Sequence, residues 1–195
     1  MNLTKIARFI SYVTGPEIWF SVLLTMGIVK SGLTIQQIVI ITPLLILFQL
    51  LIPLGLFHFF IQTKRVSGWD LNLKQDRMTL APIGVMAIGA GLLITYYFGN
   101  YKIFDLAVIS YVVILIIGFI NRYWKISIHA TLCTLGTISI NYLYNWHIPW
   151  LFLVIPVVLW ARYQLKKHDI FQVIGGFVLT AIVVFIGLYV FGLLS

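Results

Sequence analysis

Charged residues are scarce in this chain. Asp, Glu, Lys and Arg together make up 9% of its 195 residues, only five residues are acidic, and apolar or aromatic residues make up 61%. The mean hydropathy is +1.04. Soluble domains carry about 25% charged residues, so this composition excludes a soluble globular protein. The sequence predicts an integral membrane protein, and we expect a single membrane domain over residues 1–195, because no stretch between the apolar runs is left for a soluble one.

Cysteine is nearly absent as well. Cys133 is the one cysteine, and it lies inside an apolar segment, which excludes a disulfide framework. The start of the chain carries Lys5 and Arg8, and the apolar stretch after it lacks a small-residue cleavage site. We therefore expect no removable signal peptide.

Long apolar runs, in contrast, recur along the whole chain. A membrane helix needs about 20 mostly apolar residues. A shorter run at 16–30 begins with Pro16, which suits the first turn of a helix, and is a candidate seventh span. The predicted fold is an all-α polytopic membrane helix bundle, with this seventh span at the N-terminus and six strong spans at 35–61, 80–98, 103–120, 126–144, 148–165 and 170–194.

The basic residues are distributed unevenly between the predicted loops. With seven crossings, all of the 13 Lys and Arg except Lys30 and Lys102 fall on one side of the membrane. Basic loops mark the cytoplasmic side. We expect the N-terminus and the basic loops in the cytoplasm of a bacterial or archaeal cell. This bias also explains the net charge of +8, so we expect no nucleic-acid partner.

Polar residues concentrate in three clusters that the predicted topology places on this same side. They are Lys64 to Arg77 (KRVSGWDLNLKQDR), Asn121 to His129 (NRYWKISIH) and Arg162 to Gln172 (RYQLKKHDIFQ). Ionisable groups at membrane depth are costly and usually face a cavity or a partner. A shared polar site is therefore our first hypothesis, although Lys and Arg at helix ends also serve simply as anchors.

Two histidines and several cations in these clusters favour phosphoryl transfer without a metal. A neutral imidazole can attack phosphorus, a second can protonate the leaving oxygen, and Lys and Arg can neutralise the phosphate oxygens. We expect Asp169 to cap the last helix, whose N-terminus favours an anion. On a helix, Lys125 and His129 would share a face. His58 and His147 lie outside the clusters, and we interpret them as structural.

The second and third clusters resemble motifs of a known family. Lys125 to His129 reads Lys-Ile-Ser-Ile-His, and Arg162 is followed by five residues and then His168. This resembles the type 2 phosphatidic acid phosphatase superfamily of membrane lipid phosphatases, whose motifs are Lys-x6-Arg-Pro, Pro-Ser-Gly-His and Ser-Arg-x5-His-x3-Asp. The resemblance covers roughly residues 60–190. The motifs of this chain are similar to those of a bacterial branch of the superfamily, which carries Lys-Ile-Ser-x-His and His-x3-Gln.

The resemblance implies a role for each matching residue and no cofactor or metal. His168 would be the nucleophile that forms a phosphohistidine, His129 the acid that protonates the leaving group, and Arg162 a phosphate clamp. Gln172 would orient His168. The further phosphate-binding residues would be Lys74, Arg77, Lys125 and Ser127.

The sequence also departs from the family pattern. The Lys-x6-Arg-Pro spacing is absent, Ile128 replaces the motif glycine, and Ala161 replaces the serine before Arg162. Gln172 stands where an aspartate would orient the nucleophile, and an amide cannot stabilise an imidazolium as a carboxylate does. These departures bear on whether the chain is an active enzyme.

Several functions fit these residues. The first is a phosphatase acting on a phospholipid or an isoprenoid phosphate or diphosphate in the bilayer. The second is an inactive relative that binds or moves anionic lipids. The third is a Mg²⁺-dependent membrane prenyltransferase, because Asp70 and Asp76 share a loop, although such enzymes need two carboxylate clusters. A small transporter is the fourth, but no span shows repeated Gly or Pro breaks.

Overall fold

The computed structural model describes residues 2–30, 32–68, 71 and 73–194, and these residues are helical without any strand. This confirms the all-α class. Contacts divide the chain into two compact units: unit 1 comprises Met1–Lys30 and Ile126–Ser195, and unit 2 comprises Ser31–Lys125. The single membrane domain stays a prediction. Asp70, which the prenyltransferase hypothesis requires, lies outside the described residues.

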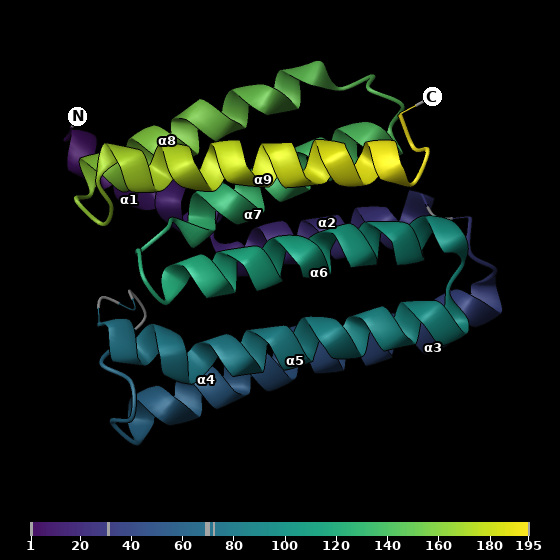
Figure 1. The fold of residues 1–195 in the computed structure, drawn as a ribbon, viewed down its shortest axis with the longest axis horizontal. Coiled ribbons are helices and arrows are strands. Elements are labelled where there is room, and N and C mark those ends of the chain that lie inside the picture. The colour runs from purple at the N-terminus through teal and green to yellow at the C-terminus, as the bar shows by residue number, and fades with distance from the viewer. Residues whose placement is uncertain (1, 31, 69–70, 72, 195) are drawn as a thin grey trace. The chain divides into compact units, whose positions relative to one another are not determined.

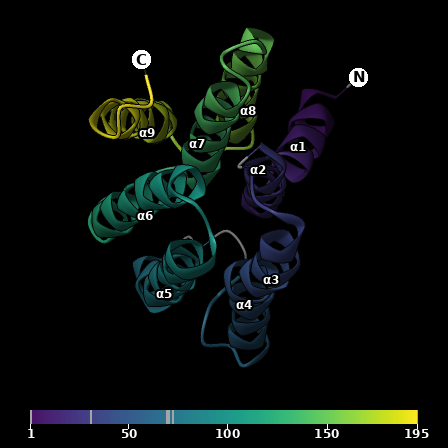
Figure 2. The same cartoon turned by 90° about the vertical axis from the view of Figure 1, so that its right-hand side faces the viewer.

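Unit 1 is built around one central helix, α7. Its elements are α1 (Leu3–Val13), α2 (Pro16–Lys30), α7 (Ile128–Leu143), the 3-10 turn η2 (Pro149–Leu153), α8 (Val154–Gln164) and α9 (Ile170–Val190). The central helix packs against α2, α8 and α9, while α1 packs against α8 (Figure 2). Most of the residues of α7 are buried.

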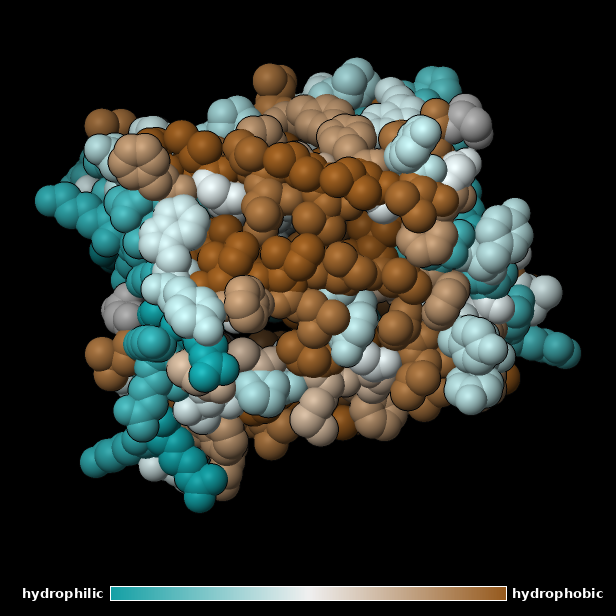
Figure 3. Space-filling view, viewed as in Figure 1, coloured by the Kyte–Doolittle hydropathy of each residue, from teal (hydrophilic) through white to brown (hydrophobic). Residues whose placement is uncertain are grey.

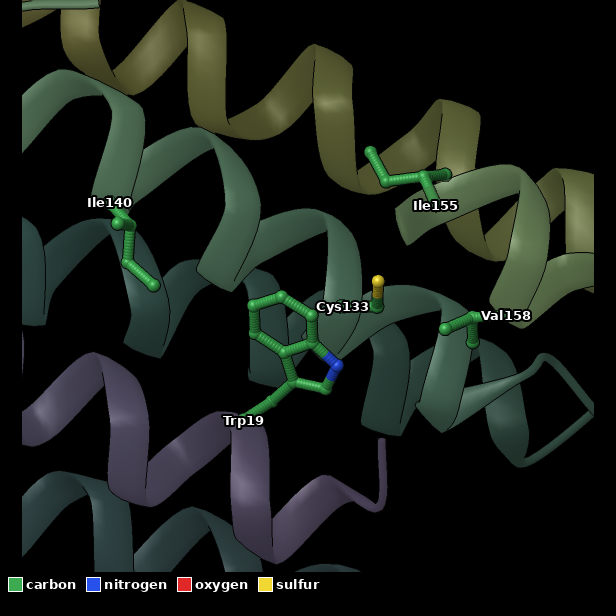
Figure 4. Packing of buried hydrophobic residues seen from close by; sticks show 5 residues of the cluster. All are labelled: Trp19, Cys133, Ile140, Ile155 and Val158. Atoms are coloured by element: carbon green, nitrogen blue, oxygen red, sulfur yellow. The ribbon is translucent and has the colours of Figure 1, made fainter. Parts of the chain in front are cut away.

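The apolar core of unit 1 lies where α2, α7 and α8 meet. The indole of Trp19 reaches from α2 toward α7, and Ile155 and Val158 of α8 complete the cluster with Cys133 and Ile140 of α7 (Figure 4). All five side chains are buried. Segments distant in the sequence are thereby held together around the central helix.

Unit 2 consists of long helices. Its elements are α3 (Ile35–Ile46), the π-helical turn η1 (Leu47–Leu51), α4 (Ile52–Gln62), α5 (Lys74–Phe98) and α6 (Tyr101–Asn121), of which α5 packs against both α3 and α6 (Figure 1). A capping box between Thr34 and Gln37 starts α3, and the side chain of Asn100 caps α6. These caps satisfy backbone N–H groups that the first turn of a helix leaves unpaired.

Four helices in the described residues are long and apolar enough to cross a membrane. They are Ile35–Gln62, which α3, η1 and α4 form together, Lys74–Phe98, Tyr101–Asn121 and Ile170–Val190. The pair α1 and α2 bends by 40° and becomes a fifth candidate if it counts as one span. Six strong spans plus a seventh are therefore not confirmed.

The predicted spans at 126–144 and 148–165 form shorter helices than expected. The helix α7 has 16 residues, about 24 Å of length against a hydrocarbon core of about 30 Å. Ser127 begins this helix as its N-cap, and buried polar residues such as Thr134 and Asn141 lower its apolar character. Pro156 has no N–H to donate to Phe152, so α8 begins only at Val154, with 11 residues.

The outer surface of α9 is apolar along its length. Ile174, Val178, Ile182, Phe185 and Ile186 are all exposed on it, and Figure 3 shows apolar residues dominating this face. A continuous exposed apolar face of this kind suits lipid rather than water. It supports the interpretation of the chain as an integral membrane protein.

A polar side chain interrupts the longest apolar helix at its π-helical turn. Gln49 lies in η1, and its amide group packs against the backbone of α5 at Gly91. A β-carbon added at Gly91 would lie 1.2 Å from Gln49 Nε2. Glycine at this position therefore provides the space that the amide occupies. The π-helical turn that carries Gln49 is a local departure from regular α-helix geometry.

We predict that Gly91→Ala raises the melting temperature of the purified protein in detergent less than Gly118→Ala does, because the added methyl group must displace the end of the flexible Gln49 side chain. Shortening the facing side chain in the double variant Gly91→Ala with Gln49→Ala should recover most of the difference. Gly118→Ala, where an added β-carbon meets nothing within 4 Å, is the matched control. A double variant no more stable than Gly91→Ala alone would contradict this contact.

Candidate functional site

The third polar cluster extends from the last turn of α8 to the first turn of α9. The Oδ1 atom of Asp169 accepts a hydrogen bond from Gln172 N–H at 2.9 Å, and the Gln172 side chain accepts one in return from Asp169 N–H at 3.3 Å. This reciprocal pair is a capping box, which confirms the prediction that Asp169 caps the helix. The Asp169 carboxylate therefore caps the N-terminus of α9, and His168 is the residue before Asp169.

The side chain of His168 contacts that of Gln172. The distance from His168 Nδ1 to Gln172 Oε1 is 3.1 Å. Because the same oxygen also accepts from the backbone N–H of Asp169, which can only donate, this end of the amide is an acceptor. In the neutral imidazole Nδ1 therefore carries the proton, and the lone pair lies on Nε2. This geometry suits the orienting role assigned to Gln172, which stays a prediction.

The helices α7 and α9 begin side by side and run in the same direction (Figure 1). Ser127 N–H donates to the carbonyl of Gln172 at 3.2 Å. At Gly176 the two helices are in close contact, since an added β-carbon would lie 2.9 Å from Ser127 O. His129 lies in the first turn of α7. The part of the second cluster that belongs to unit 1, residues 126–129, therefore meets the third cluster at one end of that unit.

The structure places Ser127 and Lys125, two residues of the second cluster, at and before the start of α7. Ser127 is fully buried, and its hydroxyl oxygen accepts from Ala130 N–H at 3.4 Å as the N-cap of α7. Because the helix starts at Ile128, Lys125 lies outside it, and the expectation that Lys125 and His129 share a helical face is wrong. The phosphate-binding roles of Lys125 and Ser127 stay predictions.

Arg162 lies in the last turn of α8, where its side chain is 7% exposed. Its Nη1 donates to the hydroxyl of Ser11 on α1 at 2.7 Å. Its carbonyl accepts from Lys167 N–H at 3.3 Å, so the chain turns back toward α9 directly after it. Sequence reasoning missed Ser11, although Ala7 and Ser11 are small residues one turn apart in a segment of mostly larger ones.

The first cluster lies in unit 2, where Arg77 holds two backbone carbonyls. Its Nε donates to Asn121 O and its Nη1 to Leu71 O, both at 3.2 Å. Asn121 is the last residue of α6, whose terminal carbonyls have no partner within the helix. Lys74 opens α5, with its Nζ 5.9 Å from the centre of the Tyr123 ring. Phosphate binding by Lys74 and Arg77 stays a prediction.

The carboxylate of Asp76 is also engaged within unit 2. It is buried and accepts hydrogen bonds from the hydroxyl and the N–H of Ser67. Within the part of the chain that the structure describes, no three His, Cys, Asp or Glu side chains gather in a way that could hold a metal ion. The Asp76 carboxylate therefore binds Ser67 in the loop before α5. This contact gives the prenyltransferase hypothesis no support.

The other two histidines bond within their own segments. His58 Nε2 lies 2.7 Å from Gln62 Nε2, and His147 Nδ1 lies 2.9 Å from the carbonyl of Tyr144. Each contact spans about one helical turn. Both agree with the structural interpretation of these residues.

We predict that Gly176→Ala destabilises the protein, because the added methyl group would force α9 away from Ser127 at an overpacking cost of about 1–3 kcal/mol. Gly27→Ala is the matched control within unit 1, since an added β-carbon there meets nothing within 4 Å. That change should be neutral or stabilising, because alanine favours a helix over glycine by about 1 kcal/mol. Thermal unfolding in detergent measures both, and equal melting temperatures would refute the close contact.

Comparison with known proteins gives no independent guide to this site. No family model, no curated protein and no solved structure matches the chain. The arrangement of His129, Arg162, His168 and Gln172 must therefore be interpreted from its own chemistry.

Proposed function

We propose that this chain is a membrane lipid phosphatase that hydrolyses a phospholipid or an isoprenoid phosphate or diphosphate through a phosphohistidine, without a metal. The observation that carries the proposal is the hydrogen bond from Ser127 N–H to the carbonyl of Gln172. It joins the segment of His129 to the segment of His168, so two histidines from separate motifs belong to one end of one helix bundle. Phosphoryl transfer needs such a nucleophile and acid pair.

The first step transfers the phosphoryl group to His168. The lone pair of Nε2 attacks phosphorus while Gln172 accepts from Nδ1–H, and the bond between phosphorus and the leaving oxygen breaks. His129 gives its proton to that oxygen, which leaves as the lipid alcohol or as a shorter phosphate ester. His129 is then the base for the second step.

The second step returns the enzyme to its starting state. His129 takes a proton from water as the water oxygen attacks phosphorus, and the bond between phosphorus and His168 Nε2 breaks. Inorganic phosphate leaves, His129 is protonated again, and His168 regains its neutral form. Protons and bonds therefore balance over the cycle.

Fixed positive charge would stabilise the phosphate oxygens in both steps. Arg162 closes α8 just before His168, and the N-termini of α7 and α9 supply the positive ends of two helix dipoles. The phosphate-binding roles that the resemblance implies for Lys74, Arg77 and Lys125 stay predictions. The exposed apolar face of α9 suits a substrate whose tail stays in the bilayer.

A second candidate is an inactive relative that binds or moves anionic lipids. The neutral side chain of Gln172 favours it, because the imidazolium that forms as His168 attacks would lack a carboxylate partner. Replacement of the aspartate by asparagine in a serine-protease triad costs about four orders of magnitude in rate. Phosphate release by the purified protein separates the two candidates.

We predict that the protein in lipid, with EDTA present, releases phosphate from at least one of phosphatidic acid, phosphatidylglycerophosphate and isoprenyl diphosphate. His168→Ala should abolish release, because the nucleophile is lost. Gln172→Asp should raise kcat by stabilising the imidazolium, and Gln172→Leu should lower it. His147→Ala, a histidine outside the site, is the matched control. A folded wild-type protein that releases no phosphate from any of these lipids would favour the inactive relative.

We further propose seven crossings, in which the α1 and α2 pair, α7 and α8 are short or bent spans packed against their neighbours. The basic loops would face the cytoplasm of a bacterial or archaeal cell, as the charge bias indicates. The site residues would then act on the inner surface of the membrane.

We predict that Tyr123→Cys in a Cys133→Ala background reacts with a membrane-impermeant maleimide only after the membrane is opened. Tyr123 is exposed in the loop after α6, whereas Trp150→Cys, also at an exposed position, should react in intact cells. The proposed topology places these two positions on opposite sides. Labelling of Tyr123→Cys from outside intact cells would reverse the proposed orientation.

A further inference from the structure

We propose that Ser11 is a positioning residue of the site, which holds the guanidinium of Arg162 in place for a phosphate group. The inference rests on the proposed function and adds α1 to the elements that form its site. It assigns a role to a segment that the sequence motifs leave out, since the resemblance begins near residue 60.

The contact between Ser11 and Arg162 is short and buried. The donor Nη1 and the acceptor Oγ are 2.7 Å apart, and the two side chains are 8% and 7% exposed. Ala7, one turn before Ser11, is fully buried on the same face of α1, and Ala161 is fully buried beside Arg162 on α8. Small residues let two helices approach closely in a membrane protein. The approach of α1 to α8 therefore brings the hydroxyl to the guanidinium.

The hydrogen bond to Ser11 helps to orient the cationic group of Arg162. The guanidinium is planar and rigid, so fixing Nη1 restricts rotation of its plane. A long arginine side chain otherwise loses much rotamer freedom when it binds an anion. Holding it beforehand lowers that entropic cost, because the group is already ordered when the phosphate arrives.

The neutral character of the serine matters as much as its position. A carboxylate at residue 11 would also orient Arg162, but it would cancel the charge that attracts a phosphate. A hydroxyl accepts the hydrogen bond and leaves that positive charge in place. Ser11 thus supplies orientation without neutralisation.

The backbone connects this contact to the nucleophile. Lys167 N–H donates to the carbonyl of Arg162, and the turn between them contains Lys166 with a positive φ of 54°. His168 follows directly on this turn. A guanidinium held by α1 is therefore fixed relative to the segment that carries the candidate nucleophile.

The test measures phosphate release from phosphatidic acid vesicles by Ser11→Ala, Ser11→Thr and the control Ser21→Ala, a serine of α2 whose hydroxyl bonds to its own helix at Glu17 O. For Ser11→Ala we expect KM to rise by about tenfold while kcat changes by less than about threefold, because the clamp binds the substrate phosphate. Ser11→Thr keeps a hydroxyl and should stay near the wild type. Should Ser11→Ala fail to fold, Ser11→Cys takes its place, since its thiol is similar in size and a weak acceptor.

A second measurement does not depend on activity. Phenylglyoxal modifies arginine, and mass spectrometry gives the rate at Arg162. Ser11→Ala should raise that rate over the wild type and Ser21→Ala should not. Inorganic phosphate should protect Arg162 in the wild type more than in Ser11→Ala.

The outcomes distinguish this inference from the function on which it rests. An active wild type, with Ser11→Ala matching Ser21→Ala in KM and in the modification rate at Arg162, overturns the role of Ser11 and leaves the phosphatase in place. A different result overturns both the role of Ser11 and the phosphatase function. In that case the wild type releases no phosphate from any lipid, and inorganic phosphate does not protect its Arg162 from phenylglyoxal. An increase in KM rescued by threonine, together with faster modification of Arg162, supports the positioning role.

Discussion

Close approach of two helix backbones at Gly176 is the constraint on which the candidate site depends. The absence of a side chain there allows Ser127 to reach the backbone of α9, and the resulting hydrogen bond aligns the starts of α7 and α9. The caps at Ser127 and Asp169 then fix where each helix begins. His129 and His168 owe their shared end of the bundle to this alignment.

Two arginines of this chain donate to neutral oxygen atoms. Arg162 donates to a serine hydroxyl, and Arg77 donates to the backbone carbonyls of Leu71 and Asn121. Such acceptors hold a guanidinium in place without removing its charge. With only five acidic residues, the chain as a whole keeps a formal net charge of +8. This suits an anionic ligand and agrees with the proposed function.

Local patterns in the sequence were sufficient for some of these features. Hydropathy predicted spans at 35–61, 80–98, 103–120 and 170–194, and the structure has a long apolar helix in each place. A helix satisfies its backbone polar groups within one continuous apolar segment, which makes it visible in the sequence. The cap at Asp169 was predictable because it involves residues three positions apart. The contact of His168 with Gln172 likewise lies within a single turn.

Features that depend on distant contacts were not predictable in the same way. The length of α7 is set by a buried cap and by polar residues that pack against other helices, and the start of α8 is set by Pro156. The short helix α1 gives no signal in a search for spans of about 20 residues. Its contact through Ser11 joins residues 151 positions apart, and a single sequence offers no pattern for such a pair.

The π-helical turn at Leu47–Leu51 has a consequence for how this chain can vary. Such a turn holds one residue more than an α-helical path of the same rise would need. Removing one residue there would restore an uninterrupted helix and leave the residues after it on nearly their present faces. Elsewhere along the span the same deletion would rotate the later residues by about 100° around the axis, so the chain should tolerate the loss of a residue best at this turn.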